Sequence, residues 1–323
     1  MQYVGLHTQQ VRNNFRSVFL LCLFPCLVLL LTLLFCVLLV LFASDNSMDM
    51  YVWEQTFQFF LQLAPYILCG IAIWFLIAYF ANTAIIRSAT GARPLQRKEN
   101  KRVYNLVENL CMSQGMTMPK VNLIEDDSLN AFASGINNRT YTVSLSRGII
   151  NRLDDGELEA VIAHELSHIR NRDVRLLIVS IVFVGIFAML TQIAFRTLLN
   201  SSGRSMSNSK KGNGKGVILI LLIALIVAAV GYFFASLMRF AISRKREYMA
   251  DAAAAEMTRQ PQELASALRK ISQNPNIKAV KRDDVAQLFI EHPRKKVKLF
   301  SGISGLFATH PPIEKRIAIL EQF

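Results

Sequence analysis

The chain has 323 residues, of which 52% are hydrophobic and 18% charged, and its formal net charge is +13. This length allows one or two domains, and the apolar fraction is too high for an ordinary soluble protein. The basic residues cluster beside apolar segments, at 12–16, 87–102 and 239–246, where they orient membrane helices and attract anionic lipid headgroups. We therefore expect the lipid bilayer, and no nucleic acid, as a partner.

Two long apolar segments lie within the first 90 residues. Val18–Ala43 is apolar except for Thr32, and Phe57–Phe80 is a second, less pure candidate. Both are long enough to span a bilayer, so residues 1–90 are predicted to form a transmembrane hairpin. A cleaved signal peptide is the weaker alternative for the first segment, because its apolar run exceeds a signal core and no clear small-x-small site follows.

The charges around this hairpin predict its orientation. Residues 44–54 carry three acidic residues and no Lys or Arg, whereas residues 87–102 are strongly basic. Because basic loops stay on the cytoplasmic side, the soluble part that follows the hairpin should face the cytoplasm.

The first soluble stretch has the pattern of a short helix followed by strands. Residues 105–110 are amphipathic, 120–124 reads as a strand, and 130–133 and 140–145 read as two strands joined by a turn at 135–138. Such a small sheet offers an edge to which an extended substrate backbone could add as a further strand.

The most specific motif is His164-Glu165-Leu166-Ser167-His168, which follows an acidic helix start at 155–159. Two histidines four residues apart lie on one helical face and can reach one metal ion. Glu165 is rotated by about 100° around the helix axis, so it can contact the attacking water without being a ligand. The motif predicts zinc-assisted peptide hydrolysis, against the alternative of a surface helix with two solvated histidines.

A catalytic zinc needs a third protein ligand, with the fourth position left to water. Glu247 and Asp251 are also four residues apart and share a helical face. We expect Glu247 to bind one zinc ion per chain, together with His164 and His168. Asp251 is expected to accept the other ring N–H of a ligand histidine, with His164 preferred. Without the histidine motif, a solvated charged helix would be the better interpretation of this stretch.

Two further apolar segments, Leu176–Ala194 and Val217–Leu237, separate the histidines from Glu247. Since both ends must meet at one metal, the chain between them must cross the membrane an even number of times. Two crossings would place the loop 196–216 outside the cytoplasm. This loop contains Lys and Arg and no acidic residue, so that location contradicts the positive-inside rule. We favour two crossings, with a shallow hairpin as the alternative, and expect this Ser-, Asn-, Gly- and Lys-rich loop to be flexible.

The C-terminal part reads as two helices, at 262–274 and 312–323. A His-Pro pair precedes the second of them at His310-Pro311, and another lies at His292-Pro293. An additional imidazole could stabilise the oxyanion of a tetrahedral intermediate. The alternative is that the His-Pro pair simply caps the final helix.

Taken together, the motifs resemble those of the HtpX-type heat-shock integral-membrane zinc metalloproteases, relatives of the CAAX prenyl proteases. The resemblance rests on residues 164–173 and 247–251, and it also covers 130–135 and 310–317. It therefore spans roughly residues 95–323.

The resemblance implies a mainly helical α+β fold, with a gluzincin-type protease domain, a small β-sheet and about four transmembrane helices. The domains would be an N-terminal hairpin at 1–90, a cytoplasmic protease domain at 91–175 and 238–323, and an inserted transmembrane hairpin at 176–237. The protein would lie in the bacterial inner membrane and cleave damaged or misfolded membrane proteins at the cytoplasmic face as part of a stress response.

The resemblance also implies roles for residues outside the zinc ligands. Asn130, with Ala131 and Phe132, would hold the substrate backbone, although a turn asparagine is the alternative. His310, with Arg316, would stabilise the oxyanion. Glu165 would take a proton from the attacking water and deliver it to the leaving amine.

Two other functions stay open at this point. A CAAX-type processing protease has the same metal motifs, but that relative is expected to contain more membrane helices than the four segments visible here. A catalytically silent, zinc-binding membrane chaperone is the third possibility, against which the intact Glu165 argues.

Overall fold

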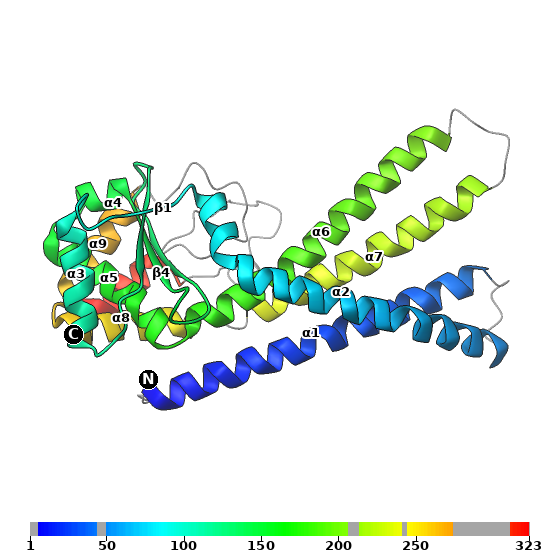
Figure 1. Ribbon diagram of the computed structural model, residues 1–323, viewed down its shortest axis with the longest axis horizontal. Coiled ribbons are helices and arrows are strands. Elements are labelled where there is room, and N and C mark those ends of the chain that lie inside the picture. Colours follow the sequence, from blue (N-terminus) through cyan, green and yellow to red (C-terminus); the bar gives the residue numbers. More distant parts are fainter. Residues whose placement is uncertain (1–5, 44–49, 206–212, 241–243, 274–310, 323) are drawn as a thin grey trace. The chain divides into compact units, whose positions relative to one another are not determined.

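The computed structural model describes residues 6–43, 50–205, 213–240, 244–273 and 311–322 (Figure 1). This part of the chain is mainly helical with one small sheet, which confirms the predicted fold class at that level. The chain divides into two compact units. The sheet unit contains residues 1–17, 79–179 and 239–323, and the helical unit contains residues 18–78 and 180–238.

The helical unit is built from parts of four long helices, which are α1 (Leu6–Ala43), α2 (Met50–Thr90), α6 (Asp173–Ser205) and α7 (Asn213–Phe240). Aromatic rings pack between three of them: the ring centroid of Phe24 lies 5.8 Å from that of Phe75 and 5.5 Å from that of Phe187. Gly231 of α7 lies so close to Phe187 that a Cβ atom there would collide with the ring.

Within the described part of the chain, two helices are long and apolar enough to cross a membrane, over Asn13–Leu41 and Trp53–Ile77, and α7 contains a shorter apolar stretch at Ile220–Phe233. The third and fourth apolar segments of the sequence lie within α6 and α7. Both helices extend into the predicted loop 196–216, since α6 continues to Ser205 and α7 begins at Asn213. The apolar pattern of α6 continues through Phe195 and Leu199, which extends the helix; residues 206–212 lie outside the described residues.

The sheet unit contains four strands in the order β1-β2-β4-β3. They are β1 (Arg93–Pro94), β2 (Lys120–Ile124), β3 (Ala131–Ser134) and β4 (Thr142–Ser146). β2 and β4 run parallel, and β3 pairs antiparallel with β4 at the edge of the sheet. The three longer strands begin and end within two residues of the predicted ranges, whereas the two-residue strand β1 was not predicted.

The turn from β3 to β4 depends on Gly135, whose φ of +106° lies in the region that favours glycine. A Cβ atom at this position would collide with the backbone of Thr140 and Tyr141. The Thr140 hydroxyl accepts the backbone N–H groups of Ile136 and Asn137 at 3.0 and 3.1 Å, which closes the turn. The turn therefore fixes where the edge strand β3 ends.

The helix α5 (Asp155–Arg170) packs against both the sheet and several helices of the sheet unit. Asp154 and Glu157 form a reciprocal capping box at its start, as expected where acidic residues open a helix. α5 contacts β3 and β4 and also the helices α3 (Lys101–Ser113), α8 (Arg244–Thr258) and α9 (Pro261–Ile271). Among the described residues, the remaining helices are α4 (Arg147–Arg152) and α11 (Ile313–Leu320), and α11 contacts α8 and α9.

Candidate metal centre

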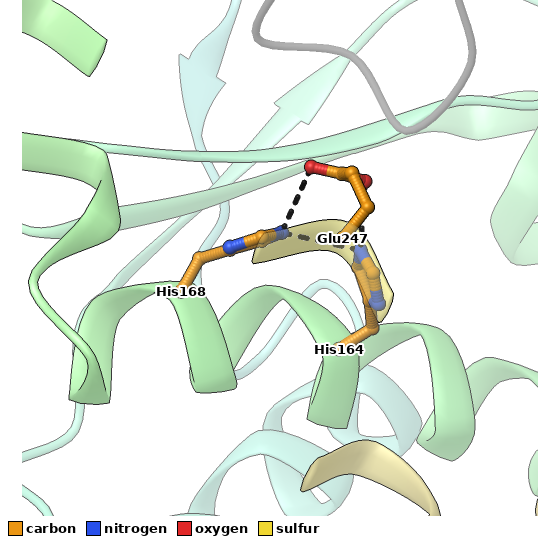
Figure 2. A group of neighbouring side chains, drawn as sticks. All are labelled: His164, His168 and Glu247. Atoms are coloured by element: carbon orange, nitrogen blue, oxygen red, sulfur yellow. Dashed lines mark hydrogen bonds and ion pairs between the residues drawn. The ribbon is translucent and has the colours of Figure 1, made fainter. Parts of the chain in front are cut away.

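His164 and His168 project from one face of α5, one helical turn apart (Figure 2). Their Nε2 atoms lie 3.2 Å from each other, and their rings meet edge to face with an interplanar angle of 89°. Their local geometry follows from the spacing of four residues, which places side chains one above the other on a helix. The apolar residues Ala163 and Leu166 beside them are fully buried, so the helix is held by its packing.

Glu247, near the start of α8, faces both rings (Figure 2). One carboxylate oxygen lies 3.7 Å from His164 Nε2 and the other 3.6 Å from His168 Nε2. Ligands at about 2.0–2.2 Å from a tetrahedral zinc ion are about 3.3–3.6 Å apart from one another. The distance of 3.2 Å between the two Nε2 atoms is close to that spacing, and each Nε2 atom lies 3.6–3.7 Å from a different oxygen of Glu247. With one ligand atom from each residue, the three atoms lie within 4.8 Å of one another. Two imidazoles and one carboxylate are also a donor set of catalytic zinc sites, so these residues fit the ion.

Asp251, one turn after Glu247 on α8, lies behind His164. Its carboxylate oxygen is 3.0 Å from His164 Nδ1, the ring nitrogen that points away from the other donors. Burial by itself raises the pKa of Asp251, but the charge of Arg316 and the contacts with Arg316 and His164 outweigh it and lower the pKa to about 2. An anionic Asp251 favours the tautomer of His164 that carries its proton on Nδ1 and leaves Nε2 available as a donor to a metal.

Arg316 of α11 is buried and holds Asp251 from the other side. Its Nε and Nη2 atoms donate to the two carboxylate oxygens at 2.8 and 2.7 Å, and its Nη1 lies 3.7 Å from Glu247. The nearby carboxylates raise the pKa of Arg316 against the effect of burial. These contacts make Arg316 a support for Asp251, and its expected role beside the oxyanion stays a prediction. His310, its expected companion, lies outside the described residues.

Asp173, the first residue of α6, gives His168 a similar carboxylate partner. Its Oδ2 atom lies 3.2 Å from His168 Nδ1, and its Oδ1 atom accepts a hydrogen bond from the side chain of Asn13 at 2.7 Å. Burial lowers the pKa of His168, but the hydrogen bond to Asp173 and the charges of Glu247, Asp173 and Glu165 raise it to about 9. The surroundings of His168 therefore favour a positive charge.

The sequence did not single out Asp173 or Asn13 for a role. One feature of the sequence could have identified Asp173: it is an acidic residue five positions after His168, close to where the metal-binding helix ends. Asn13 lies 160 residues away from Asp173 in the sequence, and no local pattern marks it.

Glu165 lies beside this cluster and is buried, with an exposed fraction of only 2%. Burial is the main cause that raises the pKa of its carboxyl group, while His164, His168 and a hydrogen bond from the backbone N–H of Ala133 act in the opposite direction. A raised pKa suits a carboxylate that must accept and release a proton near neutral pH.

The three residues expected to hold substrate lie at the start of the edge strand β3. Asn130 is buried, and its side-chain oxygen accepts the backbone N–H of Ala131 at 2.9 Å. Since backbone groups alternate in direction along a strand, the N–H groups of Ala131 and Ala133 point the same way, and β3 contacts the helix α5 that carries Glu165. The edge of β3 is thereby placed next to Glu165. Phe132 is fully buried, so its side chain belongs to the core of the unit.

Comparisons with known proteins show the family of the chain. The sequence profile of peptidase family M48 matches residues 97–323. A protein named "Protease HtpX homolog" from Bacteroides fragilis is 68% identical over 325 residues, which covers 100% of both chains. A second one of that name, from Dictyoglomus thermophilum, is 41% identical over 257 residues, or 77% of this chain and 80% of its own.

Among solved structures, a crystal structure of S. mikatae Ste24p is similar with a TM-score of 0.47 and 17% identity. The match covers 89% of this chain, which spans 61% of that longer protein. The profile match and the relative that is similar over its whole length show the family directly. The chain therefore belongs to peptidase family M48 and is a metalloprotease.

Proposed function

We propose that the protein is a multi-pass, zinc-dependent endopeptidase that cleaves damaged or misfolded membrane proteins at the cytoplasmic face of the bacterial inner membrane. The observation that carries the chemistry is the group formed by His164, His168 and Glu247, in which one ligand atom from each residue lies within 4.8 Å of the others. Asp251 and Asp173 behind the two imidazoles support the same assignment, because catalytic metal ligands commonly donate their second N–H to a carboxylate.

A zinc ion held by these three residues would polarise the scissile carbonyl and lower the pKa of a water molecule. Glu165 takes a proton from the attacking water and delivers it to the leaving nitrogen. Its burial supports this role, because a carboxylate screened from bulk water holds its proton more readily between the two steps. Asp251 and Asp173 keep the imidazoles in one orientation throughout.

The edge strand β3 is the proposed site for the substrate backbone. An extended peptide could add to its outer edge as a further strand, so that main-chain hydrogen bonds position it without regard to its side chains. The contact between β3 and α5, the helix that carries Glu165, supports this location. Such backbone recognition suits a protease that acts on many unfolded chains.

The topology is proposed from charge and hydropathy together. Residues 1–90 and 176–237 would form two transmembrane hairpins, and residues 91–175 and 238–323 would form the cytoplasmic protease domain. The two spans that meet the length and composition of membrane helices support the first hairpin. The apolar sequences within α6 and α7 support the second.

The first experiment is a zinc titration of the full chain, purified in detergent in the presence of a chelator. Proteolysis of an unfolded membrane-protein substrate should appear as zinc is restored, and Glu165→Gln should bind zinc with unchanged affinity but lose proteolysis. A matched control is Glu256→Gln, which alters an exposed carboxylate on α8. Equal proteolysis by the wild type and Glu165→Gln would exclude Glu165 as the base.

The substrate assignment has its own test. Cleavage of folded and unfolded forms of one membrane protein should differ strongly in favour of the unfolded form. Cleavage confined to prenylated C-terminal peptides would instead identify a processing protease with the same zinc chemistry.

A further inference from the structure

We propose that Asn13, near the start of α1, is a positioning residue of the metal centre that orients His168 through Asp173. The inference rests on the proposed role of His168 as a metal ligand, and it adds the N-terminal helix to the parts of the chain that build the site. Asn13, His168 and Asp173 all belong to the sheet unit.

The contacts form a short relay of hydrogen bonds. The side-chain nitrogen of Asn13 donates to Asp173 Oδ1 at 2.7 Å, and Asp173 Oδ2 lies 3.2 Å from His168 Nδ1. Asn13 and Asp173 are both buried, with exposed fractions of 6% and 4%. The two carboxylate oxygens thus have different partners, one on the N-terminal helix and one on the proposed metal ligand.

Asn13 also fixes the backbone that carries Asp173. The same side-chain nitrogen donates to the carbonyl oxygen of Asn171 at 3.0 Å, and Asn171 is the C-cap of α5. The next residue, Arg172, has a φ of +60°, so the chain passes from α5 into α6 through a tight turn. One side chain therefore ties α1 to both the carbonyl end of the metal-binding helix and the carboxylate behind His168.

The guanidinium group of Arg246 lies close to the same carboxylate of Asp173, so Asn13 is needed to keep that carboxylate oriented toward His168. Arg246 donates from Nη1 to the backbone oxygen of Asp173 at 3.3 Å, and the same atom lies 3.7 Å from Asp173 Oδ1. If the amide of Asn13 were removed, the buried Oδ1 would lose its close donor and the carboxylate would rotate toward Arg246. Oδ2 would then move away from His168 Nδ1, and the ring of His168 would no longer be held in one orientation.

The experiment measures zinc affinity of the full chain in detergent by competition with a chromophoric chelator. Asn13→Ala and Asn13→Leu should both weaken zinc binding by about tenfold, the lower end of the effect expected for groups that orient a ligand. Leu has the same branched arrangement of four heavy atoms as Asn but no donor, so a loss shared by Ala and Leu separates the lost donor from a cavity. The matched control is Ser17→Ala, because Ser17 is also buried on α1 but its hydroxyl donates within the helix, to the carbonyl oxygen of Asn13.

A double-mutant cycle tests whether Asn13 acts through Asp173. Asn13→Ala should have no further effect on zinc affinity in the Asp173→Ala background, whereas a general defect of α1 would weaken binding equally in both backgrounds. Wild-type affinity in both Asn13 variants, or an equal loss in Ser17→Ala, would overturn the inference.

His168→Ala separates this inference from the function proposed above. If His168→Ala loses zinc while Asn13→Ala and Asn13→Leu bind it normally, only the role of Asn13 is wrong. If His168→Ala binds zinc as the wild type does, the metal assignment itself fails.

Discussion

At the scale of single residues, the metal centre is a cluster of buried carboxylates and cations whose positions depend on one another. Asp251 supports His164, Asp173 supports His168, and each of these carboxylates has its own partner, Arg316 or Asn13. Burying such charges is costly unless they are paired and hydrogen-bonded, so removal of one member is expected to disturb the others. The zinc affinity of the site should therefore change when residues that do not contact the metal are substituted.

Arg316→Lys tests the role of the guanidinium group. A lysine keeps the positive charge but cannot donate to both oxygens of Asp251 at once, so His164 should lose part of its support. We expect zinc affinity, measured by chelator competition, to fall by about tenfold. If Arg316 acted only on the oxyanion, zinc affinity would stay at the wild-type value and only the rate of proteolysis would fall.

Sequence reasoning found the part of the site that local spacing encodes. His164 and His168 are one helical turn apart, so their meeting follows from the helix alone. Glu247 required a chemical argument, because it lies 79 residues after His168 and only the need for a third ligand points to it. Asn13 could not be found this way, since its contact with Asp173 exists only after α1 has packed against the turn between α5 and α6.

At the scale of elements, the strands β2, β3 and β4 were predictable because each is a short run of residues with strand propensity between turn residues. β1 was not, since a two-residue strand that contains Pro94 has no pattern of its own and forms only by pairing with Leu123 and Asn122. The order β1-β2-β4-β3, which leaves β3 at the edge, is likewise a property of the packed sheet.

Gly135→Ala tests the turn that ends the edge strand. Alanine would have to adopt a φ of +106° and its Cβ atom would meet the backbone of Thr140, so we expect a loss of at least about 1–3 kcal/mol of stability. Thermal unfolding in detergent measures the change. Gly115→Ala is the matched control, because Gly115 also has a positive φ, of +61°, but a Cβ atom there would meet open space. An equal loss in both variants would mean that the close approach at Gly135 has no consequence.

At the scale of the whole molecule, the sequence contains a conflict between charge and geometry. The residues that meet at the metal centre lie on both sides of the apolar segments in α6 and α7, which requires an even number of membrane crossings between them. The basic residues between these segments nevertheless favour the cytoplasmic side. Each Lys or Arg in the loop favours the cytoplasmic side by about 1 kcal/mol. An apolar helix that stayed out of the bilayer would expose many apolar side chains to water, and the free energy lost with their burial would be larger.

We therefore predict that the segment between α6 and α7 lies outside the cytoplasm. In a cysteine-free background, Ser207→Cys should react with a membrane-impermeant maleimide in intact cells. Lys98→Cys, at an exposed position of the sheet unit, should react only after the cells are opened. Protection of both cysteines until the cells are opened would mean that the second hairpin enters the membrane without crossing it. The metal centre would be unaffected by that result, since a shallow hairpin also returns Glu247 to the side of His168.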